Sequence, residues 1–302
     1  METAEARYDQ LVDRVEVLYE EGRPTDALAV LDAADEDLAP WFAELAHLRA
    51  CLLGASGQAD AALDALRHAS DAGAWWAEQI LVGDDDLADL QDRPEFQRIV
   101  EVSETRRTAD PTPPHVSLPA AKPTGLVVAL HGAGQRSMHA ARDWAGVLEL
   151  GYALVCVESS QLMSPMYRTW PDPEKAREDI ARVLAELPLE LRDLPTIAAG
   201  FSAGGRVALD WALTGTPVPV AGVVVLAPAL RSLPAEAHGV LAPAVVLIGT
   251  DDDLVEVVDE AAGQLTSSGL TIEKLTGLGH AFPADFGPLR AAFSSASTAT
   301  GA

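Results

Sequence analysis

The sequence contains few cysteines and few basic residues. Its 302 residues include two cysteines, and 21 lysines and arginines stand against 46 aspartates and glutamates, which gives a formal net charge of −25. This charge argues against nucleic acid or an anionic membrane as a partner, because both are themselves negatively charged. Cys51 and Cys156 lie in apolar surroundings far apart in the sequence. We expect two buried free thiols in a reducing compartment.

Long apolar runs are also missing. No stretch approaches the roughly 20 apolar residues that a membrane-spanning helix needs, and the first residues, Met-Glu-Thr-Ala-Glu, are acidic, unlike a signal peptide. We therefore expect a cytoplasmic protein. No nucleotide-binding glycine loop and no metal-ligand spacing stands out, so we predict neither cofactor nor metal. The acidic run Asp84–Asp86 lacks the spacing of a calcium loop, and we expect it to cap a helix.

What the sequence does contain is enough apolar residues, 48%, for two domains with their own cores. Residues 1–105 have helical periodicity only, and the stretch 22–31 recurs at 57–66, an offset of about 35 residues. Ala27 matches Ala62 in this alignment, and small residues there let paired helices pack closely. The region resembles two tetratricopeptide repeats followed by a divergent third helix pair at 75–104. Such helices could bind a protein partner, mediate self-association or pack on the rest of the chain.

The remaining boundaries follow from composition. Residues 106–114 form a proline-rich linker. We expect a second domain at 115–296, which starts with a short strand at 115–119, and a flexible tail of small polar residues at 297–302.

The most informative stretch is 196–205, an apolar strand that turns at Gly200-Phe201-Ser202-Ala203-Gly204 and continues as a helix. This is the pattern of a nucleophile elbow, which holds a serine on a strained turn at the top of a parallel sheet. A side chain two residues before or after the serine would collide with the neighbouring strand or helix. The free N–H groups at the start of the helix would face developing negative charge.

Three further segments supply the partners that such a serine needs. The apolar run 126–130 ends in His-Gly-Ala-Gly at 131–134, where a backbone N–H, that of Ala133, would join that of Ala203 in an oxyanion hole. We expect His131 to be structural. The apolar run 244–249 ends in three acids, of which Asp252 is selected by the pattern Gly-Thr-x-Asp-x-x-Val, with Asp251 and Asp253 as alternatives.

The third segment is the glycine-rich loop 277–283, which follows a short strand at 271–275 and carries His280. Together the three segments give the order Ser202, Asp252, His280. The α/β-hydrolases use this order, and chymotrypsin-like and subtilisin-like folds do not.

On these motifs, residues 115–296 resemble the α/β-hydrolase family, and within it the small carboxylesterases and the dienelactone-hydrolase-like and prolyl-oligopeptidase-like members. The resemblance implies an α/β fold, a mostly parallel sheet flanked by helices. It also implies roles: Ser202 as nucleophile, His280 as general base and Asp252 as the acid that orients it. Dienelactone hydrolases proper use cysteine as nucleophile, and dehalogenases and epoxide hydrolases use aspartate. The serine argues against both chemistries.

A long loop at 158–172 follows the strand 152–157, at the edge of the sheet where pockets form in α/β proteins. Met163, Tyr167 and Trp170 in this loop, together with Phe201, could line a substrate pocket, although loop residues of this kind could equally cover the edge of the core. No insertion is long enough for a helical cap domain. We expect an open site.

The motifs leave three functions to weigh. The first is a carboxylic-ester hydrolase acting on a small acyl substrate, with a peptide or thioester as other acyl groups that the same residues serve. The second is a serine peptidase of the prolyl-oligopeptidase type, although no propeller precedes the domain. The third is a hydrolase-fold scaffold without activity, whose helical repeats recruit a protein. The complete set of Ser202, Asp252 and His280 argues against the third.

Overall fold

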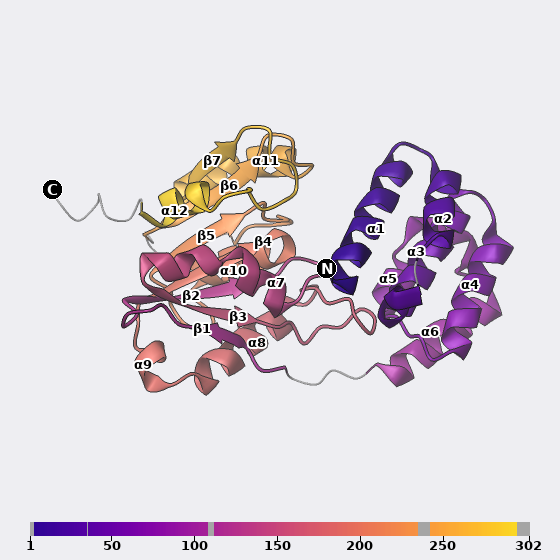
Figure 1. The fold of residues 1–302 in the computed structure, drawn as a ribbon, viewed down its shortest axis with the longest axis horizontal. Helices are drawn as coiled ribbons and strands as arrows, with labels where there is room; N and C mark the ends of the chain where they lie inside the picture. The colour runs from indigo at the N-terminus through magenta and orange to yellow at the C-terminus, as the bar shows by residue number, and fades with distance from the viewer. Residues whose placement is uncertain (1–2, 35, 108–111, 235–241, 295–302) are drawn as a thin grey trace. The chain divides into compact units, whose positions relative to one another are not determined.

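The computed structural model describes residues 3–34, 36–107, 112–234 and 242–294. Its internal contacts divide the chain into two compact units (Figure 1): Met1–Ala109 with Leu162–Tyr167, and Asp110–Gln161 with Arg168–Ala302. The tip of the long loop after the strand 152–157 thus belongs to the first unit, which the sequence does not predict. The predicted tail at 297–302 and the centre of the predicted linker lie outside the described residues.

Helices are the regular secondary structure of the N-terminal part of the first unit within its described residues, as its periodicity predicts. Its elements are α1 (Ala4–Glu20), α2 (Pro24–Asp32), η1 (Glu36–Trp41), α3 (Phe42–Ala55), α4 (Ala59–Asp71), α5 (Glu78–Val82), η2 (Asp85–Leu90) and α6 (Pro94–Arg106).

Consecutive helices of this unit pack against one another, α1 on α2, α2 on α3 and α3 on α4. The two copies of the sequence repeat become α2 and α4, and the matched residues Ala27 and Ala62 are fully buried. Small side chains there allow the close approach that the repeat predicts. The third helix pair is reduced to the short α5, the 3₁₀ helix η2 and α6. The tetratricopeptide resemblance stays a prediction.

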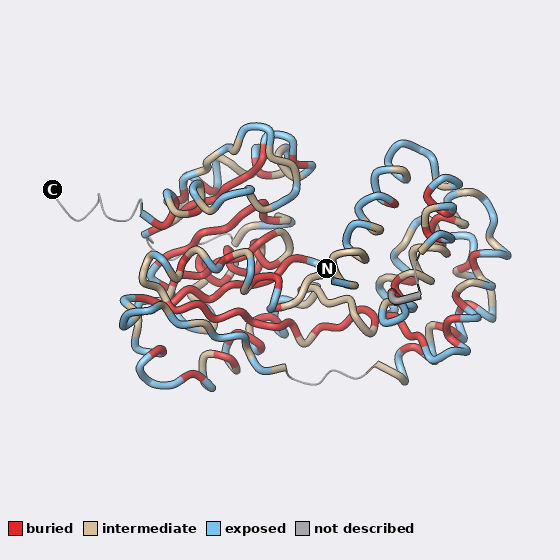
Figure 2. Tube along the Cα trace, in the orientation of Figure 1, coloured by how far each residue is buried: buried red, intermediate tan, exposed pale blue. Residues whose placement is uncertain are grey.

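The second unit is built on one seven-stranded sheet in the order β1-β3-β2-β4-β5-β6-β7. Its strands are β1 (His115–Ser117), β2 (Gly125–Leu130), β3 (Tyr152–Val157), β4 (Thr196–Phe201), β5 (Gly222–Leu226), β6 (Ala244–Gly249) and β7 (Thr271–Leu275). Every strand pair is parallel except β1 with β3. The central strands are buried along almost their whole length (Figure 2), as continuous apolar runs require when helices cover both faces of a sheet.

The helices of this unit are α7 (Ser137–Asp143), η3 (Ala145–Leu150), α8 (Pro173–Glu186), α9 (Leu189–Arg192), α10 (Ser202–Thr214), α11 (Val255–Ser267) and α12 (Gly287–Ser294). The chain moves from β2 outward to β3 and then crosses back past β2 to β4. Because crossovers are right-handed, this reversal places α7 and α8 on opposite faces of the sheet. A reversal of strand order also opens a crevice at the carboxyl ends of the strands, where α/β proteins bind ligands.

The carboxyl end of β4 and the start of α10 have no room for a side chain at two glycine positions. A side chain at Gly204 would place its Cβ 2.4 Å from the carbonyl oxygens of both Leu130 and His131, and one at Gly200 would place its Cβ 2.4 Å from the carbonyl oxygen of Gly204. These neighbours are backbone atoms and cannot rotate away. The two glycines therefore let the first turn of α10 lie directly against the end of β2.

We expect Gly204→Ala to lower the free energy of unfolding by about 1–3 kcal/mol, the usual cost of overpacking a rigid site. Urea unfolding followed by circular dichroism measures this. Gly263→Ala on α11 is the matched control, since a Cβ there meets nothing within 4 Å. That change should be neutral or stabilising by up to about 1 kcal/mol, because alanine favours a helix more than glycine does. Equal effects at the two positions would contradict the steric reading.

Candidate active site

Ser202 stands at the turn between β4 and α10 in a backbone conformation that side chains rarely adopt. Its φ angle is 51°, in the left-handed region, and Phe201 before it is extended. Such a conformation costs about 1–3 kcal/mol and persists only where the surroundings enforce it. Here the enforcement comes from β4, buried between β2 and β5, and from the N–H of Ala229, which donates to the carbonyl oxygen of Ser202 at 3.0 Å. The strained turn projects the hydroxyl group from the edge of the sheet.

Two further side chains meet this hydroxyl in a hydrogen-bonded series. His280 Nε2 lies 3.0 Å from Ser202 Oγ, and His280 Nδ1 lies 3.0 and 3.1 Å from the two carboxylate oxygens of Asp252. Asp252 is buried, and its Oδ1 also accepts the N–H of Leu254 at 2.8 Å. The neighbours Asp251 and Asp253 are exposed. Of the three acids in this turn, Asp252 is the one that faces the imidazole.

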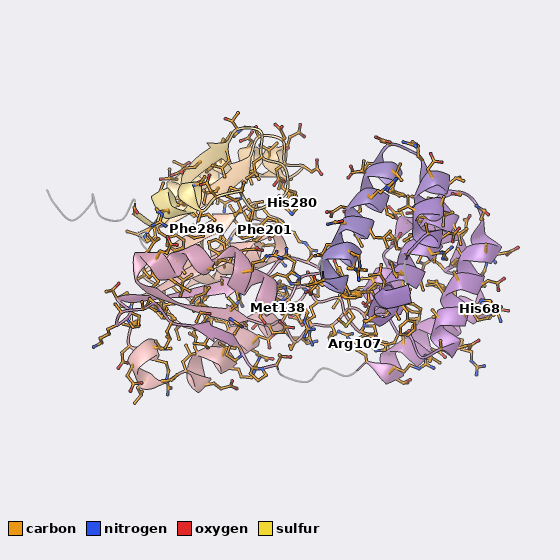
Figure 3. All side chains as sticks on the ribbon, viewed as in Figure 1. His68, Arg107, Met138, Phe201, His280 and Phe286 are labelled. Atoms are coloured by element: carbon orange, nitrogen blue, oxygen red, sulfur yellow. The ribbon has the colours of Figure 1, made fainter. Side chains whose placement is uncertain are left out.

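The loop that carries His280 is held by aromatic packing. Phe201 lies 4.9 Å from the imidazole and 5.1 Å from the ring of Phe282, measured between ring centroids. Phe282 in turn meets Trp144 edge-on. Phe201 and His280 lie close together on the second unit (Figure 3). Phe282 does not stand out in the sequence, yet it anchors the loop two residues beyond the histidine.

The segment after β2 presents one unused backbone donor. The N–H of Gly132 donates to Gln135 Oε1 and the N–H of Gly134 donates to the carbonyl oxygen of Arg168, each at 2.9 Å. Between them, the N–H of Ala133 has no acceptor within the described part of the chain, and Ala133 is exposed. The N–H of Ala203 in the first turn of α10 also lacks an acceptor there. The geometry thus leaves the two predicted oxyanion donors available.

A buried carboxylate, Glu158, ties this segment to the sheet. Its Oε1 accepts from Arg136 Nε at 3.0 Å and pairs with Arg168 Nε at 3.2 Å, and its Oε2 accepts the N–H of Ser137 at 2.6 Å. Burial alone would raise the pKa of Glu158, but the hydrogen bonds from Ser137 and Arg136 hold it below its usual value. Glu158 was not predicted as a site residue, and the sequence signal that could have identified it is a charged residue directly after the buried strand β3. Glu158 therefore holds the far end of the loop 131–137, at Arg136 and Ser137, and ties it to Arg168.

His131 is part of the same support and is held in a single neutral form. Its Nδ1 donates to the carbonyl oxygen of Gly132 at 2.8 Å, and its Nε2 accepts the N–H of Ser159 at 3.2 Å. Trp170 lies against the ring and donates its Nε1–H to the carbonyl oxygen of His131. Complete burial lowers the pKa of His131 to about 4. Both ring nitrogens are engaged, which fits a structural role.

This buried histidine should make stability depend on pH. In the unfolded chain His131 takes up a proton near pH 6.5, whereas the folded protein resists it until about pH 4. Between those values the unfolded state binds more protons, so the free energy of unfolding falls as the pH falls. We expect a loss of about 2 kcal/mol from this group between pH 7.5 and pH 5.

Urea unfolding at pH 7.5, 6 and 5 measures this dependence. His131→Asn should flatten it, and His115→Asn, which removes an exposed histidine of β1, should leave it unchanged. Equal slopes for His131→Asn and the unsubstituted protein would contradict the assignment.

The four predicted pocket residues lie in different surroundings in the structure. Phe201 lies against the imidazole of His280, as described above. Trp170 is fully buried in the core of the second unit, beneath the loop after β2. Met163 and Tyr167 belong to the first unit, where Met163 is buried and its sulfur accepts a hydrogen bond from Gln79. Of the predicted pocket residues that belong to the second unit, Phe201 is the one that lies beside His280.

One group in the first unit has the side chains of a metal site. The ligand atoms of His47, Cys51 and Asp84 all lie within 4.8 Å of one another. The three come from α3 and from the residue before η2, too far apart in sequence to form a recognisable spacing. Asp84 also accepts the N–H of Asp86 and so caps η2, as predicted.

Within the described ranges, no helix is both long and apolar enough to cross a bilayer.

Comparison with known families supports the division into two parts. Residues 7–110 match the family described as A/B hydrolase-like, N-terminal domain. The match begins within α1, extends through α6 and ends where the second unit begins. No curated protein matches the sequence.

Solved structures extend the likeness to the second unit. The crystal structure of esterase PE8 is 23% identical, covers 61% of this chain and 97% of its own, and superposes with a TM-score of 0.50. An uncharacterized protein from Bacillus cereus is 23% identical over 94% of this chain and 96% of its own, with a TM-score of 0.49. A Bacillus cereus carboxylesterase is 18% identical over 57% of this chain and 87% of its own, with a TM-score of 0.45.

The mostly parallel sheet and the superposition on PE8 show that the second unit has the α/β-hydrolase fold. The resemblance expected from the motifs is therefore confirmed. The chain thus has an N-terminal region that matches the A/B hydrolase-like N-terminal model and a second unit with the α/β-hydrolase fold.

Proposed function

We propose that this protein is a serine hydrolase that cleaves carboxylic esters through an acyl-enzyme. The observation that carries the proposal is the unbroken series from Ser202 Oγ to His280 Nε2 and from His280 Nδ1 to Asp252, with each distance between 3.0 and 3.1 Å. The left-handed backbone at Ser202 adds to it, because structural serines have no need of such strain.

In the proposed mechanism, Ser202 Oγ attacks the acyl carbonyl carbon while its proton passes to His280 Nε2. Asp252 accepts the Nδ1–H of His280, which keeps Nε2 free to take the proton and stabilises the imidazolium that forms. The tetrahedral oxyanion accepts hydrogen bonds from the N–H groups of Ala133 and Ala203, each worth about 3–4 kcal/mol in the transition state. His280 then protonates the leaving group, and water, activated by the same imidazole, hydrolyses the acyl-enzyme.

An ester is the substrate class that we infer from the comparison, since PE8 is named an esterase. The same triad could serve a serine peptidase, which is the second candidate. We expect a small-molecule ester as substrate and a cytoplasmic location.

The proposal is tested by labelling the full-length protein with a fluorophosphonate and measuring its intact mass. A single adduct that is absent from Ser202→Ala would support an activated serine, and p-nitrophenyl esters compared with aminoacyl p-nitroanilides would separate esterase from peptidase. A well-folded protein that forms no adduct and cleaves neither substrate would overturn the proposal in favour of a scaffold.

A further inference from the structure

The second unit contains a cavity of about 260 Å³ that neither the triad nor the two oxyanion donors line. Its walls come mainly from α8, α10 and the segment 230–234 after β5, all within that unit. This volume lies just below that of sites that enclose a whole drug-sized ligand, so it suits one end of a small molecule.

Arginine dominates the charge of this cavity. Arg177, Arg206 and Arg231 line it, and Asp210 is the one acidic residue among its described lining residues. Asp210 accepts from Arg177 Nη2 at 3.1 Å, and Arg177 also pairs with Glu174. Within the described part of the chain, the guanidinium groups of Arg206 and Arg231 are left without a carboxylate partner, in a protein whose net charge is −25.

The guanidinium of Arg206 has donors that a ligand can reach. Its Nη2 donates to the carbonyl oxygen of Trp170, and its Nε and Nη1 have no acceptor among the described residues. Arg206 is half-buried, and neither of these nitrogens is among the unpartnered atoms that are sealed from solvent. Two N–H groups are therefore open to the cavity.

The two unpaired arginines also affect each other. Burial lowers the pKa of Arg206, and the positive charge of Arg231 lowers it further. An anion between the two groups would relieve this repulsion, and a carboxylate can accept two parallel hydrogen bonds from one guanidinium. The acidic surface of the protein opposes such an anion only weakly, because physiological salt screens charges beyond about 8 Å.

The cavity lies one helical turn from the nucleophile. Arg206 follows Ser202 by four residues on α10, which places the two residues about 6 Å apart on the same face of the helix. The wall segment 230–234 begins directly after Ala229, whose N–H donates to the carbonyl oxygen of Ser202. No residue of the loop that carries His280 is among the described lining residues. Since the leaving group must lie beside His280, the cavity is on the acyl side of the proposed site.

From this combination we propose that the cavity binds a carboxylate at the far end of the acyl group, held by Arg206 and Arg231. On the proposed function of Ser202, on which this assignment rests, the substrates are monoesters of short dicarboxylic acids. Apolar side chains of the walls, such as Val207 and Leu230, cover the methylene groups of the acyl chain. A neutral acyl chain leaves both guanidinium groups without a counter-charge.

Steady-state kinetics with two p-nitrophenyl esters of equal acyl length test this, the mono-glutarate and the neutral pentanoate. The full-length protein should have a kcat/KM about tenfold or more higher for the glutarate ester, the effect expected of charge-assisted hydrogen bonds. Arg231→Gln should lower the ratio of the two values about tenfold, and so should Arg206→Gln. Arg231 is exposed and has no partner within the described ranges, so its replacement should not disturb the fold.

Arg192→Gln on α9, which removes an exposed arginine outside the cavity, is the matched control and should leave the ratio unchanged. Equal kcat/KM for the two esters in the unsubstituted protein would overturn the proposal. So would a ratio that neither Arg206→Gln nor Arg231→Gln changes.

Calorimetric titration of glutarate into Ser202→Ala separates this proposal from the hydrolase proposal, because it needs no hydrolysis. Glutarate should bind, and adding Arg231→Gln to Ser202→Ala should weaken its binding about tenfold. Ester hydrolysis without glutarate binding would overturn the carboxylate site and leave the hydrolase proposal standing. Glutarate binding that depends on Arg231, in a protein that cleaves neither ester, would support the carboxylate site and overturn the hydrolase proposal. Binding of inorganic phosphate but not of glutarate would overturn the choice of a carboxylate.

Discussion

Replacing Ser202 by alanine should lower kcat/KM for p-nitrophenyl ester hydrolysis by about 10⁴–10⁶-fold. The substitution removes the one atom that can form the acyl-enzyme, and the two oxyanion donors and the binding surface account for what remains. Initial rates over a range of ester concentrations measure the effect.

The fold should survive this change. Alanine at position 202 has the same Cβ as serine, so the strain of the left-handed backbone is the same. The substitution removes the hydrogen bond between Ser202 Oγ and His280 Nε2. The melting temperature is therefore expected to stay within a degree or two. Ser267→Ala at the end of α11 removes another serine hydroxyl, one that donates to the carbonyl oxygen of Gln264, and should leave the rate unchanged. Full activity in Ser202→Ala would show that the hydrolysis belongs to another residue.

The architecture of the second unit could be predicted because its strands are buried on both faces. Runs such as 152–157 and 244–249 are apolar at every position, and the structure has β3 and β6 at those residues. The turn at 200–204 could be predicted equally well, since glycine is needed wherever a Cβ would lie within 3 Å of backbone atoms. A strand at β5 was not predicted, although Gly222–Leu226 is an apolar run of the same kind.

The candidate site could be read from the sequence where a residue stands in the segment that leaves a strand. Ser202 directly follows β4, Asp252 stands in the turn after β6 and His280 in the loop after β7, and parallel strands bring their carboxyl ends to one edge. The residues that support the site could not be read in this way. Arg168 and Trp170 reach the segment after β2 through a long loop, and their partners are backbone atoms that no side-chain motif records.

The loop tip at 162–167 belongs to a unit that could not be predicted from its own sequence. Met163 and Tyr167 have the composition of a pocket wall, and the interpretation as pocket or core was open in the sequence. In the structure they belong to the N-terminal unit, where Met163 accepts the N–H of Ala77 through its carbonyl oxygen. Which body a loop joins depends on side chains far away in the sequence, here Glu44 and Gln79, and no local pattern contains them.

The acid turn gives the second large effect. Asp252→Asn should lower kcat/KM by about 10⁴-fold, the cost of fixing a catalytic imidazole in the wrong tautomer. The N–H of Leu254 holds Oδ1 of Asp252, so in the variant the amide oxygen keeps that bond and the NH₂ group takes the place of Oδ2. That NH₂ group would face His280 Nδ1, which must then accept a hydrogen bond. The proton moves to Nε2, and the histidine can no longer take the proton of Ser202.

Asp251→Asn is the matched control, because Asp251 is exposed and its carboxylate accepts a hydrogen bond from the hydroxyl of Thr250. It should change the rate by less than about threefold, as surface substitutions away from a site do. Steady-state kinetics and fluorophosphonate labelling rates on the same preparations check both variants, and their melting temperatures check folding. A crippled Asp251→Asn beside an active Asp252→Asn would move the acid by one residue. Equal activity in both would mean that the carboxylate beside His280 does not set its tautomer.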